Sequence, residues 1–255
     1  MYFVVADIHG FYSLTKAELS RRGFFDSKEN KLILLGDALD RGDEPVETVD
    51  FLCELCEENR LIYVRGNHED LFADMLLEIS RGEHTIWHHR KNGTWDSALK
   101  LVGMDEGEAR YDPELFVRRA RATRFYSYLL NHTVDYFETE HYIFTHGYIP
   151  CRVEGWAPMI KYSYMDSWRE ATADAWRSAR WFNGIDVACT YGVREEGKTI
   201  VCGHFHTSFG HARISRICSE FGDDAIFDPF YSDGLIALDA CTKFSGKINC
   251  LVIDD

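Results

Sequence analysis

Five runs of apolar residues along the chain each end in side chains that can bind a metal ion or move a proton. The five clusters place aspartate, asparagine or histidine next to glycine, and they read Asp7-Ile8-His9-Gly10, Gly36-Asp37, Gly66-Asn67-His68-Glu69, Thr145-His146-Gly147 and Gly203-His204-Phe205-His206. One such cluster alone is typical of a turn, because Asp, Asn and Gly are common turn residues. Five of them in one chain predict that the side chains converge on a shared metal site.

The ligand types predict a pair of divalent cations at this site. Imidazole, carboxylate and amide groups together suit Mn²⁺, Fe²⁺ or Zn²⁺. Two cations about 3.5–4 Å apart can hold both the attacking and the leaving oxygen of a displacement reaction. Asp37 is suited to bridge them, because a carboxylate has two oxygens. Cys202 lies beside one cluster, and we expect it to be a buried thiol rather than a ligand.

The apolar runs also predict a layered α/β fold. Seven of them have the length and composition of strands, at residues 2–6, 31–35, 61–64, 141–144, 198–202, 234–238 and 248–253. A turn at 245–247 is expected to join the last two. Helical spacing of apolar residues indicates helices at 46–58, 69–80 and 113–132. Strands that alternate with helices predict an α/β architecture, in which ligands gather beyond the carboxyl ends of the strands.

The length and charge of the chain narrow the classes of partner. A chain of 255 residues fits one domain, 1–255, with insertions at about 82–135 and 148–197 that border the site. The net charge of −14 argues against nucleic acid and an anionic membrane as partners, because like charges repel. The eight cysteines do not indicate a disulfide framework in a chain this long. The chain opens on a strand and has no run of about 20 apolar residues, so we expect a cytoplasmic protein.

Three segments resemble a known family. Residues 6–10 (ADIHG), 36–42 (GDALDRG) and 65–69 (RGNHE) are similar to the motifs GDxHG, GDxVDRG and RGNHE of the phosphoprotein phosphatases. These enzymes are a branch of the calcineurin-like metallophosphoesterases, and the resemblance is to the bacterial serine/threonine type. Ala6 replaces a glycine and Leu39 replaces a valine. The resemblance implies a two-sheet β-sandwich flanked by helices, in four αββα layers.

The resemblance also implies a set of metal ligands. One metal would be held by Asp7, His9 and Asp37. The other would be held by Asp37 together with Asn67, His146 and His204. His206 is a further candidate ligand, because the wider superfamily uses a GHxH motif whose second histidine joins the first metal. The branch usually has only the first of these histidines. Mn²⁺ is the expected ion, with iron or Zn²⁺ as alternatives.

Catalytic roles follow from the same positions. The resemblance implies direct attack of a metal-bridging hydroxide on phosphorus. His68 would protonate the leaving oxygen, and Asp40 would orient His68. Arg41 would bind phosphate oxygens, because a guanidinium matches their geometry. The family usually has a second phosphate-binding arginine between the equivalents of His146 and His204, and we favour Arg180 over the neighbouring Arg177.

Three functions are consistent with these residues. The first is hydrolysis of a phosphomonoester, as in a serine/threonine or dual-specificity protein phosphatase, with a phosphorylated protein or a small phosphorylated molecule as substrate. The second is hydrolysis of a dinucleoside polyphosphate such as diadenosine tetraphosphate, for which closely similar motifs are used. The third is binding of metal or phosphate without catalysis, which the complete residue set disfavours. The sequence leaves the substrate, the native metal and the oligomeric state open.

Overall fold

Each central strand is apolar on both faces, and strand β1 (Tyr2–Val5) shows how this builds the layers. Phe3 and Val5 pack into a core on one side of the strand, and Val4 packs into a different core on the other side. Successive side chains of a strand point to opposite faces, so a run of four apolar residues serves two cores at once. The strand is therefore buried between a helical layer and a second sheet.

The computed structural model describes residues 1–83, 87–155 and 159–255, and within them the strands form two five-stranded sheets and a two-stranded one. The first sheet has the order β12 (Cys250–Ile253), β1, β2 (Lys31–Leu35), β3 (Leu61–Val64) and β4 (Thr133–Val134). The second has the order β10 (Phe230–Ser232), β11 (Leu235–Ala237), β9 (Thr199–Cys202), β6 (Tyr142–Phe144) and β5 (Phe137–Glu138). Strands β1 to β4 pair in parallel, as do β11, β9 and β6.

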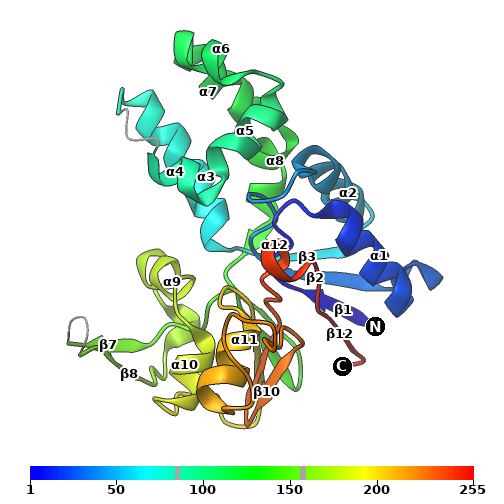
Figure 1. The fold of residues 1–255 in the computed structure, drawn as a ribbon, viewed down its shortest axis with the longest axis vertical. Helices are drawn as coiled ribbons and strands as arrows, with labels where there is room; N and C mark the ends of the chain where they lie inside the picture. Colours follow the sequence, from blue (N-terminus) through cyan, green and yellow to red (C-terminus); the bar gives the residue numbers. More distant parts are fainter. Residues whose placement is uncertain (84–86, 156–158) are drawn as a thin grey trace.

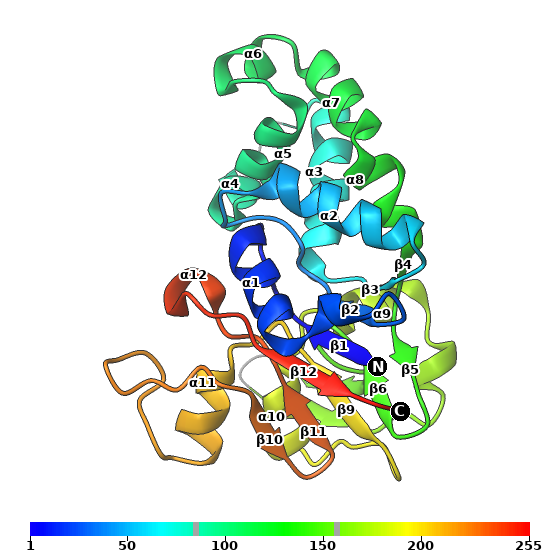
Figure 2. The same cartoon turned by 90° about the vertical axis from the view of Figure 1, so that its right-hand side faces the viewer.

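The two sheets share a core, and helices cover their outer faces. Val4 of the first sheet and Val201 and Ile236 of the second belong to this shared core. The first sheet packs on α1 (Tyr12–Arg22) and α2 (Pro45–Glu57), and the second on α9 (Ala173–Ala179) and α10 (Gly184–Cys189). These four layers appear in Figures 1 and 2. The predicted fold class, an αββα sandwich, is confirmed.

A group of helices extends beyond the first sheet, at the top of Figures 1 and 2. It consists of α3 (Asn67–Ser80), α4 (Trp87–Asn92), α5 (Thr94–Val102), α6 (Glu106–Tyr111), α7 (Pro113–Ala122), α8 (Arg124–Ser127) and the 3₁₀ turn η2 (Leu129–His132). Shorter elements complete the fold: η1 (Phe24–Asp26), β7 (Arg152–Glu154), β8 (Lys161–Ser163), η3 (Trp168–Glu170), α11 (Thr207–Phe209), the π turn η4 (Gly210–Ile214) and α12 (Thr242–Ser245). No helix of the described ranges is long and apolar enough to span a bilayer.

The seven predicted strands all form. Two other predictions were wrong, namely the turn at 245–247 that joins the last two strands and the single helix at 113–132. The runs at 234–238 and 248–253 lie in different sheets, as β11 and β12, and α12 lies between them. Both runs are apolar on two faces, so the sequence does not tell which sheet each joins. The helix expected at 113–132 is three short elements. It breaks at Thr123, whose extended backbone and side-chain oxygen cap α8.

Candidate metal centre

The carboxyl ends of five parallel strands place most of the predicted ligands at one edge of the sandwich. β1 leads into Asp7 and His9, and β2 leads into Asp37, as the parallel pairing of these strands requires. β3 leads into Asn67 and His68 at the start of α3, whereas β6 and β9 lead into His146 and His204. These side chains are buried, apart from the half-buried His204. The two sheets thus contribute to one site.

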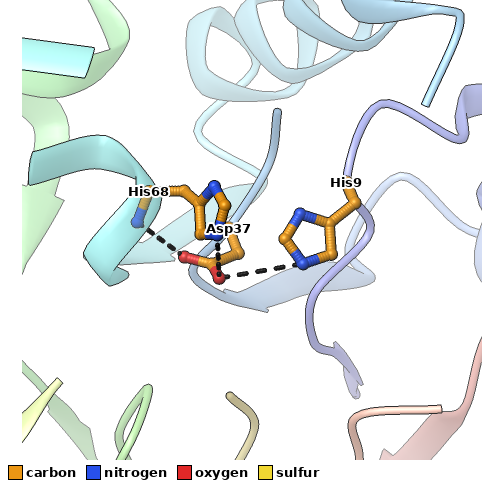
Figure 3. A group of neighbouring side chains, drawn as sticks. All are labelled: His9, Asp37 and His68. Atoms are coloured by element: carbon orange, nitrogen blue, oxygen red, sulfur yellow. Dashed lines mark hydrogen bonds and ion pairs between the residues drawn. The ribbon is translucent and has the colours of Figure 1, made fainter. Parts of the chain in front are cut away.

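Asp37 lies between two groups of possible metal ligands. One group is His9, Asp37 and His68, and the other is Asp37, His146 and His204, and within each group the ligand atoms lie within 4.8 Å of one another. Asp37 Oδ2 is 3.8 Å from Nε2 of both His9 and His68 (Figure 3). Asp37 Oδ1 is 3.4 Å from His146 Nε2. Each carboxylate oxygen therefore faces a different group, as a bridging ligand requires.

Main-chain hydrogen bonds of two histidines occupy Nδ1 and so make Nε2 the ring nitrogen that can bind a cation. His9 Nδ1 donates to the carbonyl of Leu39 at 2.9 Å, and His146 Nδ1 donates to the carbonyl of Leu35 at 2.7 Å. In a neutral imidazole the other nitrogen, Nε2, then carries the lone pair. Asn67 Oδ1 lies 2.8 Å from Nε2 of His146. Two acceptor atoms this close fit a shared cation.

The pKa shifts of the buried histidines and of Asp37 favour the protonation states that bind divalent metals. Burial, and then the nearby Arg41 charge, lower the pKa of His9 well below its ordinary value. Burial, and then His146, lower the pKa of His204 to about 3. Although burial opposes it, the surrounding imidazoles hold the pKa of Asp37 well below its usual range. Neutral imidazoles and an ionised carboxylate are the forms that bind metal.

Asp7 carries an electrostatic cost that a cation would relieve. Burial, and then the neighbouring Asp239 and Asp37, raise the pKa of Asp7 well above its ordinary value. Two glycines let the backbone approach these carboxylates closely. A Cβ at Gly203 would lie 2.2 Å from Asp7 Oδ2, and a Cβ at Gly66 would lie 2.3 Å from Asp37 Oδ1. The donor set and its close packing therefore fit two divalent ions.

The backbone of the site is strained at the residues that carry chemistry. Positive φ angles occur at Asp7 (52°), His9 (46°), Asp37 (55°), Asp40 (79°), Arg41 (62°) and His204 (64°). Residues with a Cβ rarely adopt this region, and each instance costs on the order of 1–3 kcal/mol. The strain falls on residues that supply the side chains of the site, and the packed strands beneath must compensate for it.

His68, Asp40 and Arg41 form a connected group beside Asp37. His68 Nδ1 donates to Asp40 Oδ2 at 2.5 Å, and both side chains are buried. The Arg41 guanidinium contacts Nε2 of His9 at 3.0 Å and Nε2 of His68 at 3.2 Å. The single lone pair of His9 Nε2 cannot both accept from Arg41 and bind a metal. A metal at His9 would therefore release that arm of Arg41 toward a phosphate.

Two predicted site residues lie in other environments. His206 Nδ1 accepts from the main-chain N–H of Phe209 at 3.2 Å and contacts Ser208 Oγ at 2.9 Å, and its Nε2 is 3.4 Å from Glu220. It caps α11 and, within the described residues, belongs to neither ligand group. The alternation that predicted two imidazoles on one side fails, because the strand ends at Cys202.

Arg180 pairs with carboxylates outside the metal centre. Its Nη1 donates to Asp70 at 2.6 Å, and its Nη2 bonds to Asp135. It lines a cavity of about 730 Å³ on that side. The next residue does reach the centre, because the Trp181 ring lies 5.7 Å from the His204 ring and is 47% exposed. The alternative, Arg177, is bound to Asp74. A phosphate contact by Arg180 would require one of its two ion pairs to open.

The structure adds two acidic residues that sequence reasoning did not select. The buried Glu69 accepts from the N–H groups of Asp37 (2.9 Å) and Ala38 (3.0 Å), and so fixes the loop that carries Asp37. Its capping-box position, three residues after Gly66, could have indicated this. Asp239 lies two residues after the end of β11 and is buried near Asp7. It obeys the same strand-end rule as the other clusters.

The chain belongs to the calcineurin-like phosphoesterase family, whose model matches residues 2–227. Serine/threonine-protein phosphatase 1 of Salmonella typhimurium is 30% identical over 109 residues, which are 43% of this chain and 46% of that protein. The bis(5'-nucleosyl)-tetraphosphatase PrpE of Bacillus velezensis is 32% identical over 137 residues, 51% of this chain and 52% of that protein. The chain thus spans about half the length of the curated relatives it matches.

Solved structures agree with the fold. The cold-active protein tyrosine phosphatase of a psychrophilic Shewanella species superposes with a TM-score of 0.50 at 16% identity, covering 96% of this chain and 72% of that chain. At this identity the likeness concerns the fold alone. The resemblance inferred from the three motifs is therefore confirmed at the level of the family, and the relatives are named for different activities.

Proposed function

We propose that this chain is a dinuclear metal-dependent phosphatase that hydrolyses phosphomonoesters in proteins, as a serine/threonine or dual-specificity protein phosphatase. The observation that carries the proposal is the buried His68–Asp40 pair beside Asp37, whose two oxygens face two ligand groups. This arrangement supplies a proton donor, a phosphate-binding arginine and metal ligands at one point. The serine/threonine phosphatase relative supports the substrate class.

The proposed ligands form two sets that share Asp37. Asp7, His9 and Asp37 would hold one divalent cation, and Asp37, Asn67, His146 and His204 would hold the other. When bound, the pair of cations supplies an activated water and neutralises charge on the phosphate. Mn²⁺ is the first ion to test, with iron and Zn²⁺ as alternatives. His206 is left out of this set because its ring nitrogens contact Ser208 and Glu220.

The side chains of this chain perform the remaining steps. Arg41 grips non-bridging phosphate oxygens and so orients the phosphorus. His68 in its imidazolium form gives a proton to the leaving alkoxide, which is otherwise a poor leaving group. Asp40 holds the imidazole by its Nδ1 and favours the protonated form. Although burial opposes it, the charges of Asp37 and Asp40 raise the pKa of His68.

A second function is favoured by one comparison. The tetraphosphatase relative matches a longer stretch than the phosphatase 1 relative, 137 residues against 109. A dinucleoside polyphosphate presents a phosphoanhydride to the centre, in which the attacked phosphorus carries two bridging oxygens instead of one. Its leaving group is a phosphate rather than an alkoxide, so it depends less on protonation by His68.

One assay separates the candidates. The metal-free protein is loaded with Mn²⁺ and given a panel of phosphoserine, phosphothreonine and phosphotyrosine peptides and, separately, diadenosine tetraphosphate. Under the proposal, kcat/KM for at least one peptide exceeds that for the dinucleotide. The reverse order supports the tetraphosphatase function. Metal binding by calorimetry without turnover of either substrate would leave a non-catalytic binding protein and overturn the proposal.

A further inference from the structure

Helix α5 contacts the loop that carries Asp40 and Arg41 at three points. Ser97 Oγ accepts the N–H of Asp40 at 3.0 Å. Thr94 Oγ1 donates to Asp40 Oδ2 at 2.7 Å. A Cβ at Gly93 would lie 2.6 Å from the backbone nitrogen of Arg41, so this loop packs directly on the start of the helix. Thr94 and Ser97 are 0% and 2% exposed, and water does not replace these contacts.

The Thr94 hydroxyl reaches the same oxygen that His68 uses. Asp40 Oδ2 receives Thr94 Oγ1 at 2.7 Å and His68 Nδ1 at 2.5 Å. The other oxygen, Oδ1, is buried without a hydrogen-bond partner among the described residues. Rotation of the carboxylate is therefore opposed by these two bonds to one atom. Without the Thr94 hydroxyl, only His68 would hold the Asp40 carboxylate. This carboxylate is the group that is proposed to orient His68, so it needs a second, independent contact.

We propose that Thr94 is a positioning residue that fixes the Asp40 carboxylate, so that a Thr94–Asp40–His68 chain of hydrogen bonds aims His68 at the leaving group. This inference rests on the proposed function. It gives the segment at about 82–135 a task beyond bordering the site, because α5 belongs to that segment. Figure 1 shows α5 within the group of helices next to α3, which carries His68.

The physical reason is the conformation of the loop. Asp40 and Arg41 have φ angles of 79° and 62°, which a residue with a Cβ adopts only when its surroundings impose it. The main-chain bond to Ser97 holds the backbone of Asp40, and the bond to Thr94 holds its side chain. Loss of an outer hydrogen bond of this kind in metal sites typically costs 10–100-fold in activity or affinity, which sets the expected scale here.

The test compares Thr94→Val, which removes the hydroxyl at similar size, with Thr94→Ser, which keeps it. Thr48→Val is the matched control, because Thr48 in α2 is similarly buried and, among the described residues, its hydroxyl donates to the carbonyl of Glu44, the residue before that helix. Each Mn²⁺-loaded variant is assayed with a phosphoserine peptide and with 4-nitrophenyl phosphate. Mn²⁺ affinity by calorimetry and melting temperature are measured alongside.

For Thr94→Val, kcat with the peptide is expected to fall about 10–100-fold while KM changes little. With the activated aryl ester, kcat should fall by less than about threefold, because its leaving group needs little protonation. Thr94→Ser should restore kcat, and Mn²⁺ affinity should stay at the wild-type value. Equal losses on both substrates, or a Thr94→Ser variant as impaired as Thr94→Val, would overturn the positioning role.

Failure of the two proposals is distinguishable. If wild-type protein hydrolyses neither ester, the proposed function fails before any variant is made. If wild type is active and Thr94→Val matches Thr48→Val in kcat on the peptide, only the role of Thr94 fails. A Thr94→Val protein that melts early and binds Mn²⁺ weakly would also count against it, because the hydroxyl would then serve the fold as a whole.

Discussion

The imidazole of His68 and the carboxylate of Asp40 meet at 2.5 Å, although both side chains are buried and lie 28 residues apart in the chain. The bond occupies His68 Nδ1 and turns Nε2 toward Asp37 Oδ2, 3.8 Å away, as Figure 3 shows. A histidine held in this way can present a proton from Nε2 once the Arg41 guanidinium, 3.2 Å from that nitrogen, has turned to a phosphate. This geometry, rather than the motif alone, supports its role as general acid.

Replacement of His68 by Asn should affect substrates according to their leaving groups. General acid catalysis contributes typically 10²–10⁴-fold, and an alkoxide needs it far more than a nitrophenolate does. We expect kcat for an alkyl phosphate to fall at least about tenfold more than kcat for 4-nitrophenyl phosphate. Assays at matched Mn²⁺ occupancy measure this ratio of losses. A ratio near one would leave His68 with an electrostatic or structural role only.

Replacement of Asp37 by Asn should release metal. Asp37 is the one residue shared by both ligand groups among the described residues, and an amide lacks the charge that holds two cations together. We expect the variant to retain fewer than two Mn²⁺ per chain and to lose most activity. Elemental analysis after gel filtration measures the metal. Asp43→Asn is the control, because Asp43 is exposed on the same loop and pairs only with Lys100. Full occupancy in Asp37→Asn would contradict the bridge.

Replacing each of the three arginines near the site by alanine should affect a different property. We expect an effect on kinetics for Arg41, on folding stability for Arg180, and little effect for Arg177. Arg41→Ala should raise KM and lower kcat, because this guanidinium is placed to contact substrate and transition state. Arg180→Ala should mainly destabilise the fold, by about 1–3 kcal/mol, because the buried Asp70 loses one of its two ion-pair partners and keeps only Arg65, at 2.8 Å. Denaturant unfolding and steady-state kinetics together test this.

Arg177 supplies the comparison for Arg180. It is part-exposed and pairs with Asp74, so Arg177→Ala should change stability by no more than about 1 kcal/mol. If Arg180→Ala instead raises KM at unchanged stability, Arg180 binds phosphate and its ion pairs open on binding. If Arg177→Ala is the damaging variant, the second phosphate contact comes from Arg177.

The contribution of Asp239 to the stability of the metal-free protein should fall as the pH rises towards 6, whereas His9 and His204, whose pKa values are lowered, contribute in the opposite direction. Burial raises the pKa of Asp239 to about 6, above the value of about 3.9 that Asp has in an unfolded chain. The folded state therefore binds this proton more tightly than the unfolded state does. The loss of folding stability from ionising Asp239 is absent below about pH 4 and complete above pH 6. The expected difference is about 2–3 kcal/mol. Urea unfolding at a series of pH values measures it.

Asp239→Asn is the matching variant, since an amide oxygen can keep the bond from the N–H of Cys241 (2.7 Å). The metal-free variant should be more stable than wild type at pH 8 and equal to it near pH 4. Loaded Mn²⁺ should flatten the pH dependence of the stability difference between wild type and Asp239→Asn, because a nearby cation offsets the carboxylate charge. A difference that stays constant with pH in the metal-free proteins would show that Asp239 does not titrate in this range.

Much of the site could be predicted because its residues obey a local rule. Apolar runs such as residues 2–6 and 31–35 are strands buried on both faces, and polar residues directly after parallel strands must meet at one sheet edge. This rule places Asp7, Asp37 and His146 together without knowledge of any contact. It failed for His206, because the chain turns into α11 before a second strand position is reached.

Only the tertiary structure decided how distant segments meet. The assignment of β11 and β12 to different sheets, the Thr94–Asp40 bond across 54 positions and the Arg180–Asp70 pair across 110 positions have no signal in local spacing. Hydrophobic periodicity fixes which face of an element is buried, but it does not fix which partner covers that face. The direction in which a guanidinium or carboxylate points depends on that partner. The sequence therefore determined which residues gather, and packing determined which of them bond to one another.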